Sequence, residues 1–185
     1  MENIIRKEIL KLFLAESINC YDFWMPRCGI ENCKSQKQAL KEAYKILSEA
    51  YLILDRGDVE ELEDYASKIQ ENVENLLEGI KKSLIYCMAY GGNLGRCVCI
   101  IKFGNALYGL TQLPYTLNRE GPIILSFLAW GEDTLDELQR TGLQHYEIRL
   151  SSSDLLRYGK SLEELTQEYM KYRLKTLEYL LGNYI

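Results

Sequence analysis

The sequence predicts one α+β domain that spans residues 1–185. Helical periodicity with capping boxes fills the first half of the chain, short β-branched or alternating segments follow it, and a leucine-rich helical pattern closes the chain. Grouped strands and segregated helices are typical of this class. We therefore expect a helical part over residues 1–90, a small and mostly antiparallel sheet of about four strands over residues 94–150, and a C-terminal helix over residues 161–182.

Three helices are expected in the first half. Residues 3–18 place apolar side chains at mixed three- and four-residue steps, which is a helical pattern. Capping boxes at Ser35–Gln38 and Asp58–Glu61 predict where two further helices begin, because the first side chain of such a box accepts a hydrogen bond from the backbone N–H three residues on. A third capping box, Ser161–Glu164, predicts the start of the C-terminal helix.

The second and third helices, expected to end near residues 54 and 88, should form an antiparallel hairpin, because only residues 55–57 connect them. The longer helix carries one apolar seam at steps close to the 3.5-residue period of a coiled coil. It outreaches its hairpin partner, so the sheet, the first helix or a second subunit is expected to cover its end. The seam consists of Leu62, Ala66, Ile69, Val73, Leu76, Ile80, Leu84 and Cys87.

The sheet is predicted from apolar, β-branched and alternating segments. Gly104-Asn105 is a two-residue sequence typical of a hairpin turn. A short helix over residues 134–140, closed by Gly142, is expected before the last strand. The four strands are expected at residues 96–103, 106–113, 122–130 and 145–150.

Composition limits the function classes. The net charge is −5, and no region has the basic excess that marks most nucleic-acid binders. No run approaches the roughly 18 apolar residues of a membrane span. The N-terminal pattern is amphipathic and carries Glu2, Glu8 and Glu16, unlike a signal peptide. We therefore expect an intracellular, cytoplasmic protein with no nucleic-acid signal and no membrane segment.

Six cysteines leave several interpretations open. Cys20, Cys28 and Cys33 share one irregular stretch and could ligate zinc with a fourth ligand, although no Cys-x2-Cys pair is present. The alternatives are a disulfide that pins this stretch or thiols packed as small apolar groups. Intracellular disulfides occur mainly in hyperthermophiles, so a thermophilic origin is one interpretation. No cofactor is predicted, and zinc remains an alternative.

A second set of cysteines lies around the predicted first strand. Side chains two apart in a strand point to the same face, so Cys97 and Cys99 should be neighbours, with Cys87 nearby in sequence. We expect them to pack on the helices as small apolar side chains. The glycines of residues 91–95 follow a helix and precede a strand, which indicates a helix C-cap rather than a phosphate-binding loop.

Arg140 and His145 form the one candidate catalytic pair. Their spacing resembles the short Arg-x4–6-His signature of the HEPN family of helical RNases. That resemblance implies a pair at one helix end and a site completed by two protomers. This chain departs from the family pattern, because Gly142 should end the helix before His145, which begins a predicted strand.

Two functional hypotheses follow. The first is a non-enzymatic binding or regulatory protein that self-associates, as a homodimer or with a protein partner, through helical surfaces. The apolar seam and the leucine-rich C-terminal helix favour it, together with the lack of a catalytic motif. The alternative is a nuclease or other hydrolase that uses Arg140 and His145.

Overall fold

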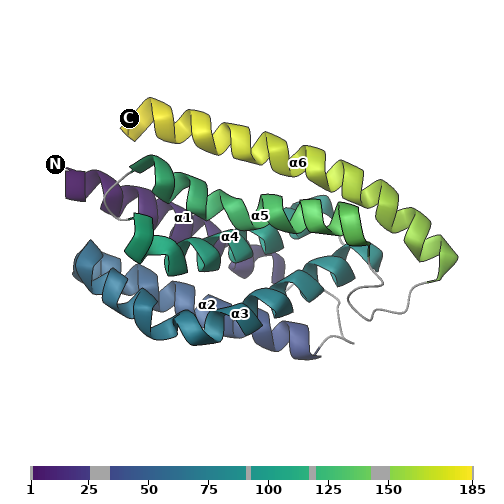
Figure 1. Ribbon diagram of the computed structural model, residues 1–185, viewed down its shortest axis with the longest axis horizontal. Coiled ribbons are helices and arrows are strands. Elements are labelled where there is room, and N and C mark those ends of the chain that lie inside the picture. Colours follow the sequence, from purple (N-terminus) through teal and green to yellow (C-terminus); the bar gives the residue numbers. More distant parts are fainter. Residues whose placement is uncertain (1, 26–33, 91–92, 117–119, 143–150, 185) are drawn as a thin grey trace.

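The computed structural model describes residues 2–25, 34–90, 93–116, 120–142 and 151–184. Helices fill these residues, and no strand occurs in them, so the α+β prediction is wrong (Figure 1). The helices are α1 (Glu2–Trp24), α2 (Lys34–Arg56), α3 (Val59–Ala89), α4 (Leu94–Thr116), α5 (Glu120–Thr141) and α6 (Ser152–Tyr184).

The helical hairpin is confirmed. α2 and α3 run antiparallel side by side (Figure 1). Asp58 caps α3 as its position predicts, because its Oδ1 accepts a hydrogen bond of 2.9 Å from the Glu61 backbone N–H. The α3 seam is buried along nearly its whole length, from Leu62 to Cys87. The part of α3 that extends past α2 is covered by α4, which takes the place of the predicted sheet.

α4 is the central helix of the fold. It contacts each of the other five helices, and no side chain from Arg96 to Pro114 is exposed. The strands predicted over residues 96–103 and 106–113 are therefore turns of one buried helix. The physical reason is that a helix covered on every side needs no polar face, so it lacks the periodicity that distinguishes a helix from a buried strand.

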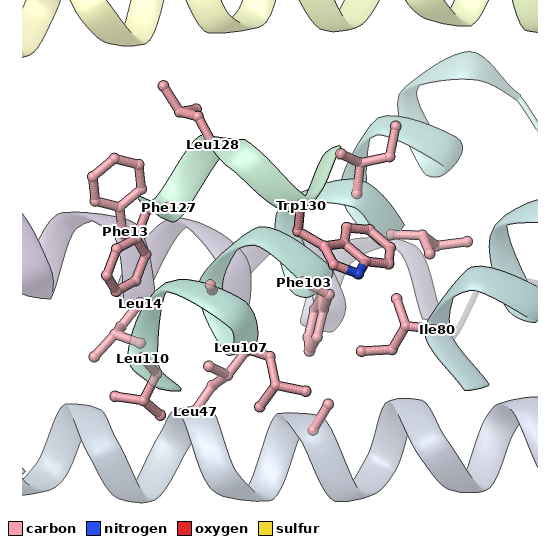
Figure 2. Packing of buried hydrophobic residues seen from close by; sticks show 14 of the residues in the cluster. Phe13, Leu14, Leu47, Ile80, Phe103, Leu107, Leu110, Phe127, Leu128 and Trp130 are labelled. Carbon is pink, nitrogen blue, oxygen red and sulfur yellow. The ribbon is translucent and has the colours of Figure 1, made fainter. Parts of the chain in front are cut away.

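The Gly104-Asn105 sequence, predicted as a hairpin turn, lies in the middle of α4. A Cβ at Gly104 would overlap the Trp130 ring, and one at Gly109 would overlap the Phe127 ring. Phe127 and Trp130 project from α5 onto the α4 backbone, and Phe127 also stacks on Phe13 with 4.8 Å between ring centroids (Figure 2). These glycines thus permit close helix packing, and no turn is formed.

The buried Asn105 side chain of α4 forms hydrogen bonds with residues of α5 and α6. Its Oδ1 accepts a hydrogen bond of 2.6 Å from the Gly131 N–H of α5, and its Nδ2 donates one of 3.2 Å to the Tyr169 hydroxyl of α6. Tyr169 in turn donates a hydrogen bond of 2.6 Å to the Leu128 carbonyl of α5. Burial, the largest cause, raises the pKa of Tyr169 to about 12. The buried Asn105 amide and Tyr169 hydroxyl therefore both have hydrogen-bond partners, as buried polar groups require.

α5 occupies the residues for which a strand and a short helix were predicted. The strand predicted over residues 122–130 is its first half, and the short helix predicted over residues 134–140 is its second half. Its predicted end is confirmed at Gly142, which has a φ of +71° and donates its N–H to the Leu138 carbonyl at 3.1 Å. The strand predicted over residues 145–150 lies outside the described residues.

α6 begins earlier than predicted. The box at Ser161–Glu164 lies inside this helix. The N-terminus is capped instead by Ser151 and Asp154: the Asp154 N–H donates to Ser151 Oγ at 3.2 Å, and the Ser151 N–H donates to Asp154 Oδ2 at 3.1 Å. One face of α6 is buried, through Tyr158, Leu162, Leu165, Tyr169 and Leu180.

Polar contacts fix how α6 is rotated. Glu16 of α1 accepts hydrogen bonds from Lys102 Nζ of α4 at 2.8 Å and from the Tyr172 hydroxyl at 3.3 Å. Arg173 Nη1 bonds Glu132 Oε1 of α5 at 2.6 Å. The opposite face of α6 therefore points away from the body of the protein. Among the described residues, no helix has the combination of length and apolarity that crossing a bilayer would require.

The close approach of α5 to α4 predicts opposite effects for two matched substitutions. Gly104→Ala places a methyl group against Trp130, and overpacking of this kind costs about 1–3 kcal/mol of unfolding free energy. Gly159→Ala in α6 meets open space, so it should stabilise the protein by roughly 0.5–1 kcal/mol through helix propensity. Urea denaturation measures both values, and a Gly104→Ala protein as stable as the original contradicts the packing.

Candidate functional site

Four cysteines of the described residues lie at and around the first turns of α4. Cys99 of α4 forms a disulfide with Cys20 of α1, with 5.6 Å between their Cα atoms. Two residues earlier in α4, the Sγ atom of Cys97 lies 3.1 Å from that of Cys87 in α3. The start of α4 is therefore joined to α1 by a covalent bond and faces α3 through a pair of thiols.

This pairing follows from α4 being a helix. Residues two apart in a helix point about 200° away from each other, whereas in a strand they share a face. Cys97 and Cys99 therefore face different neighbours, and the prediction that they lie on one face is wrong. Sequence reasoning missed both pairs because it assigned these residues to a strand. A helical assignment would have placed Cys97 and Cys99 on different faces.

The predicted zinc set is not assembled by the described residues. The Cys20 sulfur is bonded to Cys99, which lies on α4 and outside the stretch that Cys20 was expected to pin. Cys28 and Cys33 lie outside the described residues, so the three-thiol hypothesis stays a prediction. Within the ranges that the structure describes, no three His, Cys, Asp or Glu side chains gather as metal ligands would.

The surroundings of the two cysteine pairs are apolar and tightly packed. Arg96 lies over the Trp24 ring with its Cζ 5.7 Å from the ring centroid. The crevice beside the disulfide, lined by Trp24, Arg96 and Phe103, has a volume of only about 10 Å³. That is room for a single water molecule at most. A small-molecule ligand therefore does not fit there.

The Cys87 thiol lies beside a hydrogen-bond donor and a positive charge. Cys97 donates a hydrogen bond to Cys87 Sγ, and this contact lowers the pKa of the Cys87 thiol. The positive charge of Arg96 lowers the pKa further, while burial opposes both effects. Hydrogen bonds and positive charges favour a thiolate, which is the reactive form of cysteine. These contacts thus favour the thiolate form of Cys87.

The structure describes only Arg140 of the Arg140–His145 pair. Arg140 is exposed in the last turn of α5 and borders an open depression with Asp133, Asp136 and Glu137. These carboxylates oppose the binding of RNA phosphates, which requires a positive surface. His145 lies outside the described residues, and Gly142 ends the helix between the two. The nuclease hypothesis therefore remains an untested prediction.

A second candidate site is a surface rather than a pocket. α6 presents an apolar row, which we define as Met170, Leu174, Leu177 and Leu181, at steps of four, three and four residues. Met170, Leu174 and Leu181 are 46%, 57% and 53% exposed. Leu177 is half-buried at the edge of the core. This spacing is that of a coiled-coil seam.

Comparison with protein-family models, with curated proteins and with solved structures gives no match for this chain. The function must therefore be argued from the residues of these two candidate sites.

The Cys20–Cys99 disulfide closes a long stretch of chain, since the two residues are separated by 79 positions. We expect the double variant Cys20→Ser/Cys99→Ser to lose about 2–4 kcal/mol of unfolding free energy, because the unfolded chain becomes less constrained. Urea denaturation without a reductant measures this loss, and the original protein in dithiothreitol should lose a similar amount. Equal stability of the oxidised and reduced protein contradicts the disulfide.

Proposed function

We propose that this chain is a non-enzymatic binding protein that forms a homodimer through α6. The observation that carries the proposal is the apolar row on α6. Exposed apolar side chains scattered singly are normal on a protein surface, whereas a row at coiled-coil spacing offers a continuous contact for another helix.

The choice of α6 rests on what the other helices already bury. The α3 seam that suggested self-association packs against α2 and α4 inside the protomer. α6 already buries one face through Leu165 and Tyr169, and the apolar row lies on a different side of the helix. A helix with apolar side chains on two sides has more apolar surface than its own protomer covers.

A second copy of the chain fits the row in an antiparallel arrangement. This arrangement sets Met170 against the partner's Leu181 and Leu174 against the partner's Leu177. Lys171 and Glu178 flank one edge of the row, one heptad apart, so Lys171 comes opposite the partner's Glu178 and the reverse pair follows by symmetry. The other edge carries Arg173, whose partly buried guanidinium is engaged by Glu132 of α5 in its own protomer. Lys171 also pairs within its protomer, with Glu168 at 3.1 Å, but both of these side chains are exposed, so this contact is weak and can exchange for the partner's Glu178. The charges available for pairing thus favour the antiparallel dimer.

The expected dimer is weak. The row covers about three helical turns, which is short beside the roughly 800 Å² that each partner buries in a standard interface. We therefore expect a dissociation constant on the order of micromolar. An interface of this strength responds to protein concentration, which suits a regulatory role.

We also propose the cytoplasm as the compartment, on the sequence grounds given above. The Cys20–Cys99 disulfide is compatible with this location where intracellular disulfides persist, as in hyperthermophiles. A cytoplasmic location therefore requires a cytoplasm in which this disulfide stays oxidised.

Leu174→Glu should convert the dimer to a monomer, because it places a charge at the centre of the row. Leu52→Glu on α2 is the matched control, since Leu52 and Leu174 are both 57% exposed. Sedimentation velocity or light scattering at about 10–100 μM should give a dimer for the original protein and for Leu52→Glu. A monomer for the original protein throughout this range contradicts the proposal.

The charge pairs test the antiparallel orientation separately. Lys171→Glu should weaken the dimer about tenfold at low salt, because each pair becomes two carboxylates. Adding Glu178→Lys should restore the original affinity by reversing both pairs. Sedimentation equilibrium measures the dissociation constants. A double variant no stronger than Lys171→Glu alone argues against this orientation.

A further inference from the structure

We propose that Cys87 and Cys97 form an oxidisable dithiol, with Cys87 as the nucleophile, Cys97 as the resolving thiol and hydrogen peroxide or another small peroxide as the oxidant. This proposal is independent of the dimer. Its geometric basis is the 3.1 Å separation of the two sulfur atoms, which come from different helices.

The positions of the two residues favour bond formation. Cys87 lies in the last turn of α3 and Cys97 in the first turn of α4, on either side of one short connection. A disulfide requires the sulfurs to approach to about 2.05 Å, so they must close by roughly 1 Å. Helix ends adjust more readily than helix interiors, because their backbone groups have fewer intrahelical hydrogen bonds.

The surroundings assign the two roles. Cys97 donates its S–H to Cys87, so Cys87 carries the sulfur lone pair that is already aligned as an acceptor. Arg96 adds positive charge beside Cys87. Among the cysteines that the structure describes, Cys99 is bonded to Cys20, and the Cys87 sulfur lies 3.1 Å from that of Cys97.

The size of the oxidant follows from burial. Cys87 and Cys97 are each only 1% exposed. A protein disulfide or a bulky thiol reagent cannot approach two such sulfurs in the folded state, whereas hydrogen peroxide is small and uncharged. Local opening of the last turn of α3 and the first turn of α4 is sufficient to admit it.

The reaction balances with one peroxide molecule. The Cys87 thiolate attacks one peroxide oxygen, an S–O bond forms, the O–O bond breaks, and the hydroxide that leaves takes up the proton lost by Cys87 to become water. The Cys97 sulfur then attacks the sulfenic sulfur of Cys87. The S–S bond forms, the S–O bond breaks, and the departing hydroxide takes the Cys97 proton as a second water. Two thiols are oxidised and one peroxide is reduced.

The test treats the folded protein with equimolar hydrogen peroxide, in a Cys28→Ser/Cys33→Ser background that removes the two cysteines outside the described residues. Remaining thiols are then blocked under denaturing conditions, and the unreduced protein is digested and analysed by mass spectrometry. We expect a peptide pair crosslinked through Cys87 and Cys97, and the loss of two alkylatable thiols. A protein that keeps both thiols overturns the proposal.

Single variants test the assignment of roles. Cys97→Ser should trap a sulfenic acid on Cys87, detected as a dimedone adduct. Cys87→Ser should leave Cys97 at least about tenfold less modified at the same peroxide dose. Equal modification of the two variants overturns the assignment. Circular dichroism verifies that each variant is folded, and the crosslink in the protein with both cysteines tests the dithiol even if a single variant unfolds.

Discussion

The structure depends on how closely α5 approaches the backbone of α4. Gly104 and Gly109 leave room for the rings of Trp130 and Phe127, so these aromatic side chains pack directly on the α4 backbone. With α5 packed in this way, α4 is surrounded by the other five helices. Close packing at such a contact leaves no room for even one added methyl group. The position of α4 then determines which cysteines meet and which face of α6 is left outside.

The Asn105 amide gives this packing its register. An apolar interface alone tolerates small shifts of one helix along another, whereas the amide has a donor NH2 group and an acceptor oxygen to satisfy at fixed points. Its partners are the Gly131 N–H and the Tyr169 hydroxyl, on two different helices. Because an unsatisfied buried polar group costs about 1–3 kcal/mol, shifted arrangements are disfavoured.

The sequence predicted the outer helices better than the central ones. α2 and α3 each have a solvated face, so their apolar positions recur at helical spacing and Asp58 marks a true start. α4 and the first half of α5 are apolar on nearly every side, so their residues fit a strand equally well. Gly104-Asn105 has the composition of a turn, but its role depends on Trp130 and Tyr169, which are distant in sequence. The cysteine pairs could not be predicted for the same reason, since the error in α4 moved Cys97 and Cys99 to one face. The leucine-rich character of α6 was visible, although which of its sides is buried depends on the packing.

The central claim is that α4 is a fixed core while the apolar row of α6 is an outer surface that pairs with a second copy. Hydrogen exchange followed by mass spectrometry at several protein concentrations tests both halves at once. The account predicts that peptides from residues 99–113 exchange slowly at every concentration, and that protection of residues 170–181 rises with concentration through the micromolar range. Exchange of residues 170–181 that does not change with concentration, or exchange of α4 as fast as that of α6, would contradict it.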